Sequence, residues 1–238
     1  MEEDIKGGVD TFMYSERLHN FCRNFSKLGR IIFYRTEYIP SQHSSDINSL
    51  QHWIDYISYN LNTKINNMRS RHPSTSVIVV GWSVSASIAY KLYLFNPKNI
   101  QCLILINFPT QTNTNEIKKF TQSQINNTHC PILFVTGSES SISKTEDIER
   151  LRNSLQCPTG FIRAKHCDDV LNLPPKYKLM MNIPQDIVDM KITEKISNFI
   201  RHHYCGDRIE STNAELSQNE DSDSDDTIFS TILLENGR

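Results

Sequence analysis

The pentapeptide Gly81-Trp82-Ser83-Val84-Ser85 is the segment of this sequence best suited to covalent chemistry. It follows an apolar run and directly precedes a predicted helix, the context in which a tight turn presents a nucleophilic serine. The usual pattern is G-x-S-x-G, and Ser85 stands here in place of the second glycine. If Ser83 is the nucleophile, the backbone N–H of Val84 at the helix start would form half of an oxyanion hole. Gly8 is the candidate for the other half.

A nucleophilic serine also needs a general base and an acid that orients it, in the chain order serine, acid, histidine. Glu139 is the one carboxylate close behind the apolar run that ends at Thr136, and His166 follows the run around Ile162. Glu139 and His166 each lie one or more residues away from the position expected for the acid and the histidine of a serine hydrolase. Two hypotheses therefore stay open: an esterase or acyl hydrolase using Ser83, Glu139 and His166, or a fold without catalysis. We favour the second.

Ser83, Glu139 and His166 must be positioned by strands and helices, and the predicted strands and helices alternate along the chain. The apolar runs are nearly featureless, which is typical of parallel strands covered on both faces. Together with the turn at Ser83 they predict an α/β fold of the α/β-hydrolase-like type, with a mostly parallel sheet flanked by helices. Few residues precede Gly8, so we expect the sheet to be shortened at its N-terminal side. The predicted strands are 30–34, 77–80, 102–106, 131–136 and 160–163, and the predicted helices 14–28, 46–71, 84–95, 144–155 and one through 187–200.

The composition of the chain bears on whether it binds nucleic acids, membranes, metals or cofactors. The net charge is −2 and no basic block stands out, so we expect no direct nucleic-acid binding. No apolar run is long enough to span a membrane. The six cysteines show no CxxC pair and no zinc-ligand spacing, and we predict no metal site and no cofactor. We divide the chain into a domain over 1–205 and a disordered acidic tail over 206–238, whose apolar stretch 228–234 has nothing local to pack on.

Several blocks of sequence resemble subunit 3 of the nonspecific-lethal (NSL) histone acetyltransferase complex, a family with an α/β-hydrolase-like domain. A family of testis-expressed hydrolase-like proteins is the nearest rival. The resemblance extends over about residues 14–200. The blocks that carry it are Ser26-Lys27-Leu28-Gly29-Arg30, Val80-Gly81-Trp82-Ser83-Val84, Asn107-Phe108-Pro109, Pro131-Ile132-Leu133-Phe134-Val135-Thr136-Gly137, Cys167-Asp168-Asp169 and Ile187-Val188-Asp189.

The resemblance implies a scaffold subunit rather than an enzyme. By the family correspondence, Asp169 stands in place of the catalytic histidine and Ser140 in place of the acid. The family usually carries asparagine where this chain has Ser83, and a serine without its base is a poor nucleophile. The implied partners are the proteins of a nuclear, chromatin-modifying complex that acetylates histone H4. We therefore expect nuclear localisation, with a cytoplasmic protein as the alternative.

Overall fold

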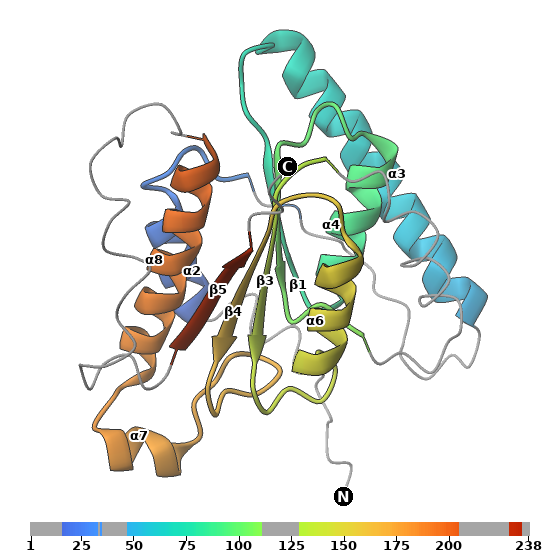
Figure 1. Ribbon diagram of the computed structural model, residues 1–238. Coiled ribbons are helices and arrows are strands. Elements are labelled where there is room, and N and C mark those ends of the chain that lie inside the picture. The colour runs from blue at the N-terminus through green and yellow to red at the C-terminus, as the bar shows by residue number, and fades with distance from the viewer. Residues whose placement is uncertain (1–15, 33, 35–46, 111–128, 205–228, 235–238) are drawn as a thin grey trace, which may run out of the picture.

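The computed structural model describes residues 16–32, 34, 47–110, 129–204 and 229–234, and a single twisted sheet lies at its centre (Figure 1). Four strands run parallel in chain order: β1 (Ile78–Trp82), β2 (Cys102–Ile106), β3 (Ile132–Gly137) and β4 (Thr159–Ala164). Every residue of β2 and β3 is buried. The featureless apolar runs are therefore confirmed as parallel strands covered on both faces.

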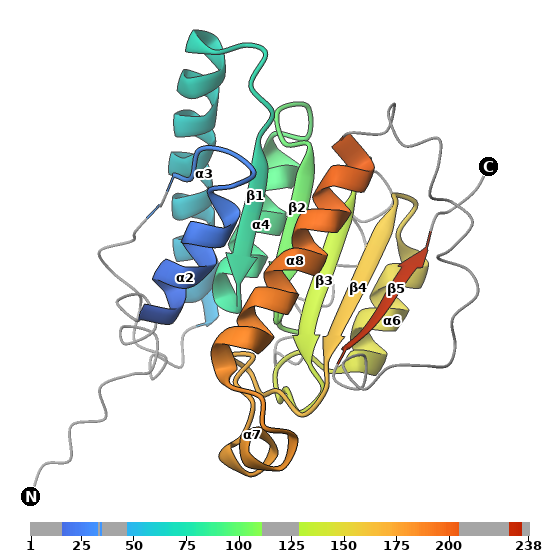
Figure 2. The same cartoon turned by 90° about the vertical axis from the view of Figure 1, so that its left-hand side faces the viewer.

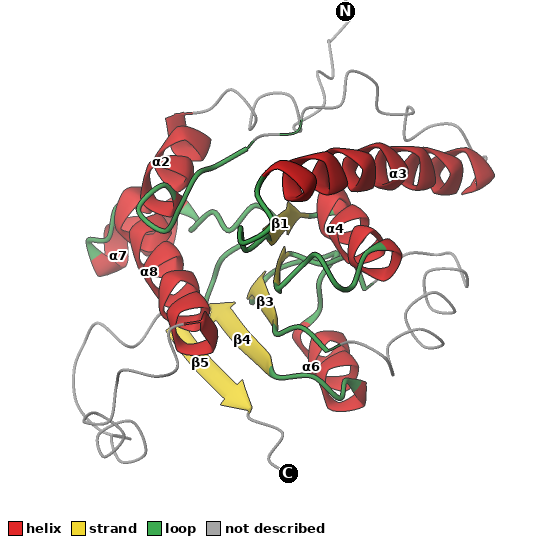
Figure 3. Cartoon of the chain, turned by 90° about the horizontal axis from the view of Figure 1, so that it is seen from above, coloured by secondary structure: helices red, strands yellow, loops and turns green. Residues whose placement is uncertain are grey.

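Helices cover both faces of this sheet, as Figure 2 and Figure 3 show from two directions. One face carries α2 (Glu16–Phe25) and α8 (Gln185–Tyr204). The other carries α4 (Val84–Phe95) and α6 (Thr145–Ser154), and the long helix α3 (Ile47–Arg71) packs against α4. The short helix α7 (Pro175–Met181) lies between β4 and α8. This layered arrangement confirms the predicted fold class.

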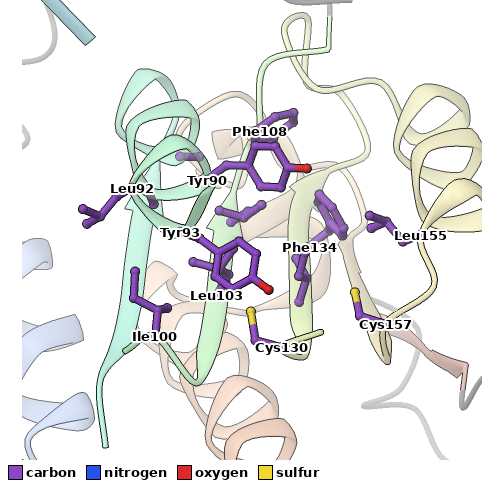
Figure 4. Packing of buried hydrophobic residues seen from close by; sticks show 14 of the residues in the cluster. Tyr90, Leu92, Tyr93, Ile100, Leu103, Phe108, Cys130, Phe134, Leu155 and Cys157 are labelled. Carbon is purple, nitrogen blue, oxygen red and sulfur yellow. The ribbon is translucent and has the colours of Figure 1, made fainter. Parts of the chain in front are cut away.

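The core on the α4 and α6 face is built largely from aromatic and branched side chains (Figure 4). Tyr93 of α4 is almost fully buried, and its hydroxyl accepts the His129 N–H at 2.9 Å. Phe108 stands edge-on between Tyr90 and Phe134, with ring centroids 6.1 Å apart in both pairs. These contacts anchor α4 on the sheet, and α4 in turn carries the turn at Ser83.

Three details differ from the sequence prediction. No strand forms at the described residues of 30–34, although an apolar run there favours one. No helix is predicted between the strand 160–163 and the helix through 187–200, but α7 forms there, with Pro175 in its first turn, where its missing N–H costs nothing. Finally, residues 229–234 form β5 (Phe229–Leu234), which pairs antiparallel with β4 and so finds a partner in this chain. The disorder predicted for the rest of 206–238 lies outside the described residues.

Candidate functional site

The turn after β1 has the backbone geometry of a nucleophile elbow. Ser83 has φ 54° and ψ −122°, a conformation that residues other than glycine rarely adopt and that costs about 1–3 kcal/mol. Its N–H donates to the Ile106 carbonyl at 2.8 Å, and its own carbonyl accepts the Ala86 N–H at 2.9 Å. The strained turn is thus held between β2 and the first turn of α4. The predicted strand–turn–helix is confirmed.

Gly81 lets the strand and the helix approach each other. A Cβ atom at this position would lie 2.6 Å from the Ala86 Cα and closer still to the Ser85 carbonyl oxygen. Both are backbone atoms of α4, so no side-chain movement could relieve the clash. Gly81 is one of only 8 glycines in the sequence, and this close approach explains why glycine is required here.

The oxyanion hole is described only in part. Val84 is the first residue of α4, so its N–H is one of those that a helix leaves without an intrahelical partner. Gly8, the candidate for the second donor, lies outside the described residues. The backbone at Ser83 therefore has the conformation of a serine nucleophile. A working serine nucleophile also needs a base and an acid.

The structure does not assemble Ser83, Glu139 and His166 into a triad. The His166 ring stacks on the Tyr177 ring of α7, with centroids 4.0 Å apart and planes 13° apart. Glu139 is exposed, and among the described residues its carboxylate accepts one long hydrogen bond, 3.3 Å, from the neighbouring Ser138 hydroxyl. Within the described part of the chain, no hydrogen bond links the Ser83 hydroxyl to an imidazole or a carboxylate.

The Asp169 carboxylate is hydrogen-bonded to the loop that follows β3. Its carboxylate accepts hydrogen bonds from the Ser140 hydroxyl (2.5 Å), the Ser141 hydroxyl (2.7 Å), the Ser141 N–H (2.8 Å) and the Ile142 N–H (3.2 Å). Burial alone raises the pKa of Asp169, but these hydrogen bonds outweigh it and hold that pKa below its ordinary value. Residues 140 and 169 are thus hydrogen-bonded partners, and the hydrogen bonds recorded for the Asp169 carboxylate come from residues 140–142.

Asn107, directly after β2, ties the same loops together. Its side chain is fully buried, its Nδ2 donates to the Asp169 carbonyl at 2.6 Å, and its Oδ1 accepts from the Thr136 hydroxyl at 3.1 Å and the Gly137 N–H at 3.2 Å. A Cβ at Gly137 would collide with the carbonyls of the Cys167–Asp168 segment, which crosses it closely. The carboxyl ends of β2 and β3 are therefore linked to the loop after β4 by buried hydrogen bonds.

A second polar cluster, which the sequence reasoning missed, fixes α2 to α8. Arg17 forms a two-pronged ion pair with the buried carboxylate of Asp189, at 2.5 and 2.6 Å, and also donates to the carbonyls of Val170 and Leu171. Gln185 donates to Asp189 and to Leu171 as well. An arginine early in one helix and an aspartate in a distant one give no local signal in the sequence.

The described residues offer no metal site, since no three His, Cys, Asp or Glu side chains gather among them. This includes the His202–His203 pair, whose rings pack edge-on against each other. The described cysteines are free thiols, and burial raises the pKa of Cys157 to about 11 and of Cys130 to about 12, so neither is a reactive thiolate. None of the described helices combines the length and the apolar character needed to cross a membrane.

Comparison with solved structures identifies the fold. The chain superposes on an α/β serine hydrolase homologue from Coxiella burnetii with a TM-score of 0.51, covering 80% of this chain and 77% of that one at 14% identity. A lidless α/β serine hydrolase family member from Xanthomonas campestris gives a TM-score of 0.52 over 80% and 74%, also at 14% identity. The chain has an α/β-hydrolase-like fold. Identity at this level carries the fold and no activity.

Comparison of sequences leaves the family open. No family model matches the chain. It is 27% identical over 146 residues to protein sumv-2 of Caenorhabditis elegans, a match that covers 61% of this chain. The match spans only 13% of that much longer protein.

Proposed function

We propose that this α/β-hydrolase-like domain is a non-catalytic scaffold that binds other proteins. One observation carries the proposal: Ser83 sits in an intact elbow, while the groups that would activate it are engaged elsewhere. His166 stacks on Tyr177, and Asp169 is held by Ser140 and its neighbours. A serine hydroxyl without a base does not become an efficient nucleophile.

Labelling with a fluorophosphonate probe tests the absence of catalysis. The full chain is incubated with the probe and its intact mass is recorded, beside a Ser83→Ala variant and an active serine hydrolase as positive control. We expect the wild-type chain and the variant to show the same background. Stoichiometric labelling that is lost in Ser83→Ala would overturn the scaffold role and establish the esterase or acyl hydrolase alternative. If labelling occurs and Glu139→Ala leaves it unchanged, the reactivity of Ser83 does not depend on a triad that includes Glu139.

We further propose that the partners are the subunits of an NSL-type histone acetyltransferase complex in the nucleus. The blocks from Ser26 to Asp189 that resemble subunit 3 support this assignment. The net charge of −2 supports recruitment through proteins rather than by direct contact with DNA. The cytoplasm remains the alternative location for a scaffold with other partners.

Purification of the tagged full chain from its native cells tests this membership. We expect acetyltransferase subunits to co-purify in constant ratio through a second, size-based step, together with histone H4 acetylation activity. A tagged chain carrying Gly81→Ala, which we expect to destabilise the domain, serves as the control for non-specific capture. Recovery of the folded wild-type chain without any acetyltransferase, or from the cytoplasmic fraction alone, would contradict the assignment.

A further inference from the structure

Strand β5 is held at the edge of the sheet by a single neighbouring strand. It lies beside β4, at the end of the sheet opposite β1 (Figure 2), and β4 is the one described element with which it makes extensive contacts. Its residues pair antiparallel with β4, from Thr159 opposite Leu234 to Ala164 opposite Phe229. Residues 205–228 separate β5 from the end of α8. β5 is therefore a strand added to the edge of the parallel sheet rather than part of its alternation of strands and helices.

The backbone of β4 explains why a strand binds at this edge. The Ser138 N–H, just after β3, donates to the Ala164 carbonyl at 2.9 Å, so the even-numbered residues of β4 bond to β3. Successive residues of a strand direct their N–H and C=O groups to opposite sides. The backbone groups of Thr159, Phe161 and Arg163 therefore point away from β3, towards β5. A row of such groups at the edge of a sheet is a template for a further strand.

The side chain of Arg163 has a donor without an acceptor at this edge. Its Nε is buried and has no hydrogen-bond partner among the described residues, and none of the ion pairs recorded there includes it. On the β3 side Arg163 lies opposite Thr136, whose hydroxyl donates to the Ser143 carbonyl at 2.9 Å. On the β5 side the opposite residue is Ser230. A carboxylate at the position of Ser230 would supply the missing acceptor, and a charge-assisted hydrogen bond is about twice as strong as a neutral one.

We propose that the β4 edge is a docking site for an extended segment of another protein, and that β5 is the chain's own occupant of this site. This docking site rests on the proposed scaffold function and names the place where a partner binds. The partner segment would pair antiparallel with β4, as β5 does, and would carry a carboxylate opposite Arg163. Because β5 belongs to the same chain, it competes at a high effective concentration. The carboxylate is the additional contact that lets a segment of another protein replace it.

Two proline variants distinguish an unoccupied β4 edge from a general effect of proline in the tail. Ile232 lies opposite Phe161, whose backbone faces β5, so the Ile232 N–H bonds to β4. Proline has no N–H, and Ile232→Pro should therefore release β5. Leu233 lies opposite Gly160 and directs its N–H away from β4, which makes Leu233→Pro the matched control. Urea midpoints should show that the domain still folds in both variants.

Fluorescence anisotropy with a labelled peptide tests the proposal on the full chain. The peptide has the sequence of residues 227–236 and carries Ser230→Glu. We expect it to bind the Ile232→Pro chain at least about tenfold more tightly than the wild-type or the Leu233→Pro chain, or by about 1.4 kcal/mol. The same peptide with Ser230→Lys should bind the Ile232→Pro chain more weakly than the glutamate peptide. Adding Arg163→Gln to the Ile232→Pro chain should abolish this difference between the two peptides.

Two results would overturn the proposal: equal affinity of the two proline variants for the glutamate peptide, or equal affinity of the two peptides for the Ile232→Pro chain. Light scattering on the wild-type chain adds a third. A dimer that Ile232→Pro dissociates would overturn the proposal as well, because the β5 of a second copy would then be the occupant. Probe labelling of Ser83 would refute the non-catalytic role without changing these affinities, so the two failures are distinguishable.

Discussion

Replacement of Asp169 by alanine should destabilise the fold rather than abolish an activity. Its carboxylate accepts four hydrogen bonds, but Ser141 is exposed and its donors can turn to water. The buried Ser140 hydroxyl and the half-buried Ile142 N–H would lose their acceptor. A buried donor left without a partner costs about 1–3 kcal/mol, so we expect a loss of about 3 kcal/mol in the free energy of unfolding.

Urea denaturation of the full chain, followed by circular dichroism, measures this loss. Glu139→Ala is the matched control, because it removes an exposed carboxylate from the same loop and should change the free energy of unfolding by less than about 0.5 kcal/mol. Equal effects of the two substitutions would refute the reasoning that Asp169 closes the carboxyl end of the sheet. A small effect of Asp169→Ala combined with loss of esterase activity would show that this carboxylate serves chemistry instead.

Three further predictions follow from the same contacts. Because hydrogen bonds hold the pKa of Asp169 below its unfolded value of about 3.9, its stabilisation is present above that pH and is lost as the pH falls through the folded pKa. The stability difference between wild type and Asp169→Ala should therefore shrink in urea titrations below about pH 4. Gly81→Ala should cost about 3 kcal/mol in the same assay, whereas Gly29→Ala, where an added Cβ meets nothing, should stay within about 0.5 kcal/mol. Arg17→Ala should lower the free energy of unfolding by about 3 kcal/mol, because it leaves the buried Asp189 carboxylate without its ion-pair partner. The apolar double replacement Arg17→Met/Asp189→Leu should lower it clearly less. Equal losses in the single and the double variant would contradict this reasoning.

The sheet and the elbow could be predicted from the sequence because their signals are local. A continuous apolar run marks a strand buried on both faces, and a glycine before Ser83 marks the tight turn. The same reasoning predicted a strand at 30–34, where the described residues show none. An apolar run indicates that a segment can be buried or can pair with a strand. Whether a strand forms there also depends on a neighbouring strand with which it can pair.

The contacts that decide the chemistry could not be predicted, since each joins residues far apart in the chain. Nothing near His166 in the sequence shows that its ring packs on Tyr177. The hydrogen bond between Ser140 and Asp169 joins two loops that fold together only through the sheet. Family correspondence did point to these two positions, although not to the bonds that they form.

The contact between His166 and Tyr177 is the feature on which the account depends most directly. Nuclear Overhauser effects between the two aromatic rings, measured in the full chain in solution, test it without reference to any substrate. We predict strong cross-peaks between the rings, which are 4.0 Å apart, and their loss in Tyr177→Ala. Cross-peaks from the His166 ring to the Ser83 β-protons, with none to Tyr177, would contradict the account and restore His166 as a general base.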